Sequence, residues 1–173
     1  MIANTELLAS LEILDQLYIK APSNRDALMH SKHALLELCG WIEEAEDYIV
    51  RRCASKLLNS EDQGWIEVKV LKNSGLHFDD NFRELLALVI GASKYRSTIE
   101  MLEATGRNFP GLNYKINAFK KPRNQHAHTH FEKSRASNST LTAYAPSLLK
   151  SHANEIYQGF SELELSLRKR RLA

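Results

Sequence analysis

Apolar residues recur along most of the chain at the three- and four-residue spacing of an amphipathic helix. The clearest stripe lies between residues 35 and 57 and consists of Leu35, Leu38, Ile42, Ala45, Ile49, Cys53 and Leu57. This spacing keeps all of them on one face of a single long helix. Ser23 and Asn24 are suited to capping its start, because their side chains can accept a hydrogen bond from the first helical turn.

Three other segments repeat the helical pattern. One covers about 7–18 and is expected to end before Pro22, because the residue before a proline is pushed out of the α region. Another begins near 79 or 80, runs to about 102 and is closed by Gly106. The last begins at Pro146, a good first-turn residue, and continues to about Leu167.

The remaining stretches are more polar. Residues 65–70 alternate as a strand would, but a lone strand has no obvious partner, so we expect a short helix or connector over 60–78. Residues 105–145 read as irregular apart from a short helix near 112–130, and 134–140 resemble a mobile loop. The prediction is one all-α domain over residues 1–173, a bundle of four to five main helices with one additional short helix.

Composition narrows the class of protein. Hydrophobic residues make up 43% of 173, which is enough for a core. No apolar run is long enough to cross a bilayer, and the acidic N-terminal segment lacks the basic start of a signal peptide. Cys39 and Cys53 fall within apolar helical pattern and are expected to be buried, reduced thiols. We therefore expect a cytoplasmic protein with no membrane partner.

Charge is distributed unevenly although the net charge is only +2. Residues 1–106 hold 11 Lys/Arg against 17 Asp/Glu, whereas 107–135 hold seven basic residues and one acid, Glu132. A local basic segment on a near-neutral chain fits contact with a polyanion. A solvated surface explains the same charges, and charge alone favours that simpler interpretation.

Residues 120–130 gather three of the seven histidines beside Lys120, Lys121 and Arg123. His126 and His130 are four apart and would share a helix face, a spacing that can ligate zinc. No nearby Cys, Asp or Glu completes a ligand set, and the three cations oppose a dication. We therefore expect neither a metal nor another cofactor.

Acid–base chemistry on a phosphodiester fits the same segment better. A histidine such as His128 moves protons near neutral pH, and Arg123 can hold a phosphate bidentately. RNA carries its own nucleophile, the 2′-hydroxyl, so no metal-activated water is required. On spacing alone, a polar surface loop remains an equal alternative.

The pattern Arg123-Asn124-x-x-Ala127-His128 resembles the signature of the HEPN superfamily, an Arg, a polar residue, then His after four to six positions. In that superfamily the motif opens a late helix of an α-helical bundle. The stretch 38–43, Leu-Cys-Gly-Trp-Ile-Glu, is similar to the RiboL-PSP-like branch.

The resemblance implies a metal-independent endoribonuclease of the kind found in toxin–antitoxin, CRISPR and phage-defence systems. Arg123 would bind the phosphate, His128 would act as base or acid, and Asn124 would orient the histidine or contact RNA. Such proteins usually act as homodimers with two facing motifs. Many are silenced by a partner that modifies a Tyr two residues after the motif His. Here that position is His130, so this route of silencing, and with it that antitoxin partner, is in question.

Other residues of the segment are assigned to RNA contact, namely Lys120, Lys121, His126 and His130. His126 could also substitute as a proton carrier or simply be exposed to solvent, and exposure is the favoured of the three alternatives. Two alternatives to an enzyme stay open. One is a non-catalytic HEPN dimer that binds RNA or nucleotide or scaffolds a complex. The other is a helical interaction module with no nucleic-acid role.

Overall fold

The computed structural model describes residues 2–73, 75–127 and 144–173, and every regular element within these ranges is helical. The predicted all-α class is therefore confirmed. In chain order the elements are α1 (Thr5–Ile19), α2 (Asn24–Leu57), α3 (Ser60–Lys72), the π-helical turn η1 (Phe78–Arg83), α4 (Glu84–Ile90), α5 (Ala92–Thr105), α6 (Leu112–Ala127) and α7 (Pro146–Lys169).

The two longest helices begin where the sequence predicts. Ser23 caps α2, because its Oγ accepts a hydrogen bond from the backbone N–H of Asp26 at 3.2 Å. Pro146 opens α7 in the first turn, where a missing N–H costs nothing. Helix α1 ends at Ile19, ahead of Pro22 as expected. Local signals thus mark these boundaries, and Asp15 of α1 adds a tertiary cap by accepting a hydrogen bond from the backbone N–H of Ser147 at 3.0 Å.

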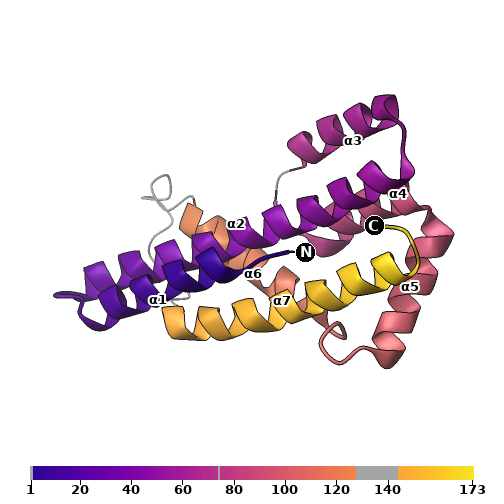
Figure 1. The fold of residues 1–173 in the computed structure, drawn as a ribbon. Coiled ribbons are helices and arrows are strands. Elements are labelled where there is room, and N and C mark those ends of the chain that lie inside the picture. Colours follow the sequence, from indigo (N-terminus) through magenta and orange to yellow (C-terminus); the bar gives the residue numbers. More distant parts are fainter. Residues whose placement is uncertain (1, 74, 128–143) are drawn as a thin grey trace.

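Helices α1, α2 and α7 lie side by side and form the main layer of the bundle (Figure 1). Helix α6 packs against both α2 and α7, while α5 crosses the C-terminal end of α7. The apolar stripe predicted for 35–57 is buried, apart from Leu57 at its end. The core is completed by side chains of α7 that are wholly inaccessible: Leu149, Ala153, Ile156, Phe160, Leu163 and Leu167.

Two predicted segments differ from expectation. The helix predicted over about 79–102 is divided at Gly91, whose φ of 89° ends α4 and redirects the chain into α5. A glycine tolerates this left-handed conformation because it has no Cβ. The strand-like alternation of 65–70 lies within α3, which Asn59 caps through the N–H of Asp62 at 2.9 Å. The short-helix alternative for 60–78 was therefore right, and there are more helices than four to five among the described residues.

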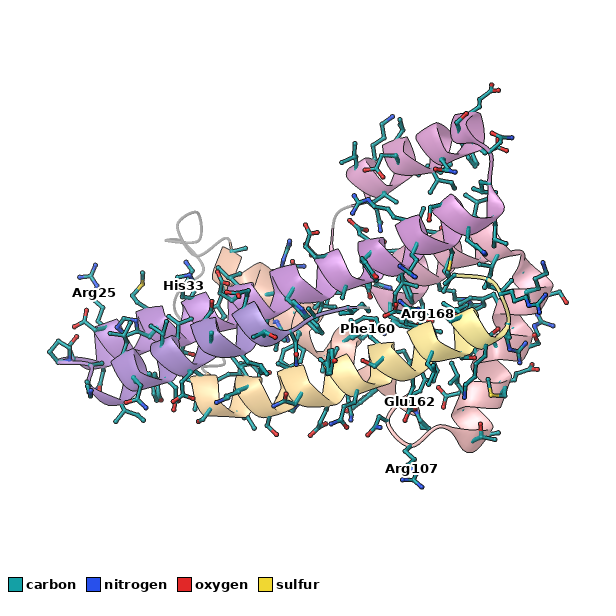
Figure 2. All side chains as sticks on the ribbon, in the orientation of Figure 1. Arg25, His33, Arg107, Phe160, Glu162 and Arg168 are labelled. Atoms are coloured by element: carbon teal, nitrogen blue, oxygen red, sulfur yellow. The ribbon has the colours of Figure 1, made fainter. Side chains whose placement is uncertain are left out.

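The start of α6 is anchored to α7 through one carboxylate. Glu162 accepts hydrogen bonds from the backbone N–H groups of Arg107, Asn108 and Phe109 at 3.0–3.3 Å (Figure 2). Partial burial raises the pKa of Glu162, but these hydrogen bonds outweigh burial and leave the pKa below its ordinary value. The turn that precedes α6 therefore has a fixed position on α7.

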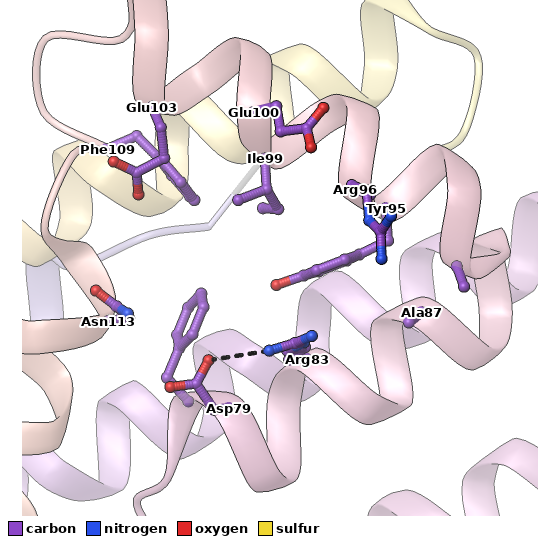
Figure 3. Close-up of a pocket in the computed structure, with 12 residues that line it drawn as sticks. Asp79, Arg83, Ala87, Tyr95, Arg96, Ile99, Glu100, Glu103, Phe109 and Asn113 are labelled. Atoms are coloured by element: carbon purple, nitrogen blue, oxygen red, sulfur yellow. Dashed lines mark ion pairs between the residues drawn. The ribbon is translucent and has the colours of Figure 1, made fainter.

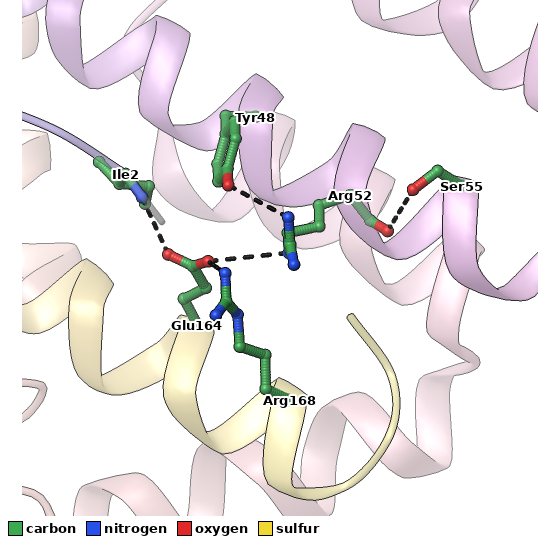
Figure 4. A network of polar contacts seen from close by, with 6 residues as sticks. All are labelled: Ile2, Tyr48, Arg52, Ser55, Glu164 and Arg168. Carbon is green, nitrogen blue, oxygen red and sulfur yellow. Dashed lines mark hydrogen bonds and ion pairs between the residues drawn. The ribbon is translucent and has the colours of Figure 1, made fainter.

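A second buried carboxylate ties the N-terminal segment to the C-terminal helix. Glu164 is 2% exposed and accepts a hydrogen bond from the backbone N–H of Ile2 at 3.0 Å (Figure 4). It also pairs with Arg168 at 2.6 Å and, more loosely, with Arg52 at 3.8 Å. A buried charge needs such partners to offset its lost hydration.

Two expectations concern the chain as a whole. Cys39 and Cys53 are free and buried, as predicted, and burial raises the pKa of each thiol to about 12. Within the described ranges, no helix combines the length and the apolarity that crossing a bilayer demands.

Candidate active site at the end of helix α6

Helix α6 carries the basic segment that the sequence singles out. Residues 120–127 form its last two described turns. Arg123 and Asn124 therefore lie late in α6 and do not open a helix, whereas the resemblance implies that they would. The short helix predicted near 112–130 is therefore confirmed as far as Ala127. His128 and His130 lie outside the described residues, so of the predicted catalytic trio the structure places Arg123 and Asn124.

Arg123 lies on the side of α6 that faces α2, with 28% of its side chain exposed. Its Nη2 donates a hydrogen bond to Oε1 of Glu43, 3.2 Å away. Its Nη1 donates to Oδ1 of Asn124, also at 3.2 Å. The guanidinium is thus held from both sides, by a carboxylate of α2 and by the neighbouring amide.

This arrangement leaves donors to spare. A guanidinium has five N–H groups, and Glu43 and Asn124 each take one. The remaining N–H groups of Arg123 have no acceptor among the described residues. A phosphate needs only two parallel N–H groups for a bidentate contact. Arg123 can therefore bind a phosphate without releasing Glu43.

His126 corrects one expectation. Its side chain is only 1% exposed, because it lies on the face of α6 that packs into the bundle. Helical geometry decides this, since positions 112, 116, 119, 122 and 126 follow one another at spacings of three or four and are all buried. In this structure His126 belongs to the core and does not present its ring to RNA.

A histidine of α7 approaches α6 one turn before Arg123. The ring of His152 meets that of Phe119 edge to face, with centroids 5.5 Å apart. Phe119 also contacts the ring of Tyr144 at 5.8 Å. His152 is half-buried, as its place on the apolar side of α7 suggests.

The cations of α6 differ in their surroundings. Lys115 pairs with Glu155 of α7 at 2.8 Å, so its charge is already compensated. Lys120 and Lys121 are exposed and make no ion pair with any described residue. Two adjacent exposed ammonium groups beside Arg123 make this end of α6 locally positive, which is the property that a nucleic-acid backbone requires.

The partner of Arg123 belongs to an acidic segment of α2. Glu43, Glu44, Glu46 and Asp47 border a hollow of about 250 Å³. Glu46 is 3% exposed, and burial, reinforced by Asp47 and Glu43, raises its pKa well above the ordinary value. Burial likewise raises the pKa of Asp47 to about 6, although Arg51 acts in the opposite direction. Glu43 thus stands at the border between this acidic surface and the basic end of α6.

Sequence reasoning did not find Glu43. It is the last residue of the stretch 38–43 that resembles a HEPN branch, but it lies 80 positions from Arg123. No periodicity within either helix indicates that the two side chains meet. Only the crossing of α2 and α6 brings them together.

The described residues contain no group of three or more His, Cys, Asp and Glu side chains placed to hold a metal ion. Compared with known proteins, the chain matches no family model, no curated protein and no solved structure.

Proposed function

We propose that this chain is a metal-independent endoribonuclease of the HEPN type, with Arg123 and His128 as its catalytic pair. One observation carries the proposal: Arg123 is held by Glu43 at 3.2 Å at the basic end of α6, with N–H donors left over for a phosphate. The residue type, its fixed orientation and its place five residues before His128 all suit phosphodiester chemistry.

In the proposed reaction the 2′-oxygen attacks the adjacent phosphorus and the bond from phosphorus to the 5′-oxygen breaks. The proton of the 2′-hydroxyl passes to a base, and the departing 5′-oxygen takes a proton from an acid. The products are a 2′,3′-cyclic phosphate and a 5′-hydroxyl. His128 serves as one of the two proton carriers. Arg123 binds the phosphate and stabilises the negative charge that develops on its oxygens.

Glu43 and Asn124 act as positioning residues for Arg123. An arginine on a helix surface samples several rotamers, and ordering it at the moment of binding costs conformational entropy. Hydrogen bonds to Glu43 and Asn124 remove that freedom beforehand. Glu43 also repels a phosphate, so it favours a guanidinium that stays between the carboxylate and the ligand. Lys120 and Lys121 supply further attraction to the backbone.

The assay uses purified protein and total RNA, single-stranded DNA of matched length, and excess EDTA. We expect cleavage of RNA but not DNA, because DNA lacks the 2′-hydroxyl. The RNA fragments should carry 2′,3′-cyclic phosphate ends, which are detected by their resistance to direct polyadenylation. A strict requirement for added divalent metal, or equal cleavage of DNA, contradicts the proposed mechanism.

One observation favours a second candidate, a non-catalytic helical module. The Arg123–Glu43 pair is part-buried and joins two helices, which is also what a purely structural contact does. In that case Arg123→Ala and Glu43→Ala lower the melting temperature by similar amounts, and the double variant loses little more. The wild-type protein then leaves RNA intact under all conditions.

A further inference from the structure

A cavity of about 300 Å³ opens between η1, α5 and the start of α6 (Figure 3). Its apolar wall is formed by Phe78 and Phe109, which are 3% and 2% exposed, together with Ile99. This volume is at the lower end of the range of ligand pockets and accommodates one ring with a short polar arm. The π-helical turn η1 supplies Phe78, Asp79 and Arg83 to it, and such turns are frequent at functional sites.

Tyr95 provides the polar group at the centre of this cavity. The residue is 9% exposed, and Figure 3 shows its hydroxyl pointing into the open space beside Arg83. No described residue forms a hydrogen bond with this hydroxyl. Burial raises the pKa of Tyr95 to about 12, so the hydroxyl stays a neutral donor. Because the hydroxyl faces the open cavity, a polar group of a ligand bound there can form a hydrogen bond with it.

The rim of the cavity carries both signs of charge. Arg83 pairs only loosely with Asp79, at 3.8 Å. Arg96, Glu100 and Glu103 form no ion pair with any residue of the described ranges. In Figure 3, Arg83 and the Tyr95 hydroxyl stand at one end, whereas Glu103 stands beside Phe109 at the other. A purely anionic ligand would meet the carboxylates, and a purely cationic ligand would meet the arginines.

We propose that this cavity binds a small zwitterion with an apolar body, of the size and chemistry of a free aromatic amino acid. Its carboxylate accepts hydrogen bonds from Arg83 and the Tyr95 hydroxyl. Its ammonium group lies toward Glu103. Its ring rests against Phe78, Ile99 and Phe109. Because the ammonium and carboxylate groups share one carbon, that carbon lies between Glu103 and the Arg83–Tyr95 pair, and the ring extends from it onto the apolar wall. The inference does not depend on RNA cleavage.

Calorimetric titrations of the full chain with four probes measure how much the ring, the carboxylate and the ammonium group each contribute to binding. L-phenylalanine carries all three features, 3-phenylpropionate lacks the ammonium group, 2-phenylethylamine lacks the carboxylate, and glycine lacks the ring. We expect saturable binding of L-phenylalanine, and affinity at least about tenfold lower for each of the other three. For the two singly charged probes, a loss of that size corresponds to one charge-assisted hydrogen bond, and for glycine to the lost burial of the ring.

Two variants locate the binding site. Tyr95→Phe removes only the hydroxyl and should weaken L-phenylalanine binding about tenfold. Ala87→Leu places a larger side chain in the cavity wall and should abolish binding. Ala118→Leu makes the same change at an exposed position of α6 outside the cavity, so it should bind as wild type does. Circular dichroism of each variant checks that it is folded.

Three results overturn the proposal. The first is no saturable binding of L-phenylalanine at millimolar concentration. The second is that 3-phenylpropionate and 2-phenylethylamine bind as tightly as L-phenylalanine does. The third is that the folded variants Tyr95→Phe and Ala87→Leu bind L-phenylalanine as tightly as wild type does.

Discussion

Glu46 is a buried carboxyl group in α2, and its Oε1 has no hydrogen-bond partner among the residues that the structure describes. Burial, together with Asp47 and Glu43, raises its pKa well above 4.5 in the folded chain. In the unfolded chain the pKa of Glu46 is near its ordinary value, so the contribution of this group to stability is fully present below that pH. Stability then falls as the pH rises toward the folded-state pKa. The pKa of Asp47 is raised to about 6, so this residue also lowers the free energy of unfolding as the pH rises from about 4 to about 6.

The variant Glu46→Gln removes this titration while keeping the shape of the side chain. We expect its free energy of unfolding at pH 8 to exceed that of wild type by about 1–3 kcal/mol, because the amide carries no charge that burial and the neighbouring carboxylates disfavour. The difference should vanish near pH 4, where Glu46 is protonated in both states. Glu44→Gln, at an exposed position of the same helix, serves as the control and should show no such gain.

Arg123 and His128 are expected to dominate activity toward RNA. Arg123→Ala and His128→Ala should each lower the cleavage rate by about a hundredfold to ten-thousandfold, the usual contribution of a positioned proton carrier or charge stabiliser. Arg25→Ala and His33→Ala make the same changes on exposed turns of α2 (Figure 2) and should leave the rate near that of wild type.

The variant Glu43→Gln tests the residue that holds Arg123. It keeps a hydrogen-bond acceptor for Arg123 but removes the charge, so we expect a smaller loss of rate than in Arg123→Ala. If Arg123→Ala cleaves RNA as fast as Arg25→Ala does, Arg123 has no part in the reaction.

At the scale of elements, α7 and the turn before α6 approach each other closely at Gly159. A Cβ added at Gly159 of α7 would lie 3.0 Å from Leu112 Cδ1 and 3.2 Å from the backbone oxygen of Asn108. The same turn donates its N–H groups to Glu162, one helical turn further along α7. This contact sets where α6 starts and therefore where its distal end, with Arg123, meets α2.

We expect Gly159→Ala to destabilise the fold by about 1–3 kcal/mol, because the new methyl group forces α7 and the turn apart. Gly64→Ala provides an opposite control within α3. Its added Cβ would meet nothing within 4 Å, and alanine favours a helix over glycine by about 0.8–1 kcal/mol. Thermal unfolding should therefore move down for the first variant and up for the second. Equal shifts of one sign would mean that close packing at Gly159 is unimportant.

At the scale of the whole molecule, we propose that the working unit is a homodimer whose two motifs share one cleft. One motif offers a single arginine and a single motif histidine, whereas the proposed reaction benefits from both a base and an acid. A twofold axis beside residues 123–128 would supply two of each. Because this also brings like charges together, RNA binding should tighten the dimer.

Light scattering should give about twice the chain mass of 19.7 kDa at micromolar concentration. Activity per milligram should fall when the protein is diluted through the dissociation range, since each site then loses half of its residues. A protein that stays monomeric and keeps the same activity per milligram at every dilution would exclude the shared cleft.

Sequence alone determined most of the helices, because their signals are local. Apolar spacing, the cap at Ser23 and the first-turn Pro146 act within one or two turns, and each set a boundary that the fold retains. The break between α4 and α5 also arises at a single residue, Gly91. It could not be predicted, because the sequence does not show whether a glycine adopts a positive φ. The motif Arg123-Asn124 was found because it is contiguous.

Tertiary structure decided which neighbour covers each face. Spacing alone places His126 on the apolar side of α6, but only the packing of that side into the bundle leaves its ring 1% exposed. Spacing does not pair Arg123 with Glu43 either, since these residues meet only where α2 and α6 cross. The cavity around Tyr95 is lined by residues of η1, α4, α5 and α6 together. Such contacts join residues far apart in the chain, and their geometry follows from packing the whole bundle, which no local pattern encodes.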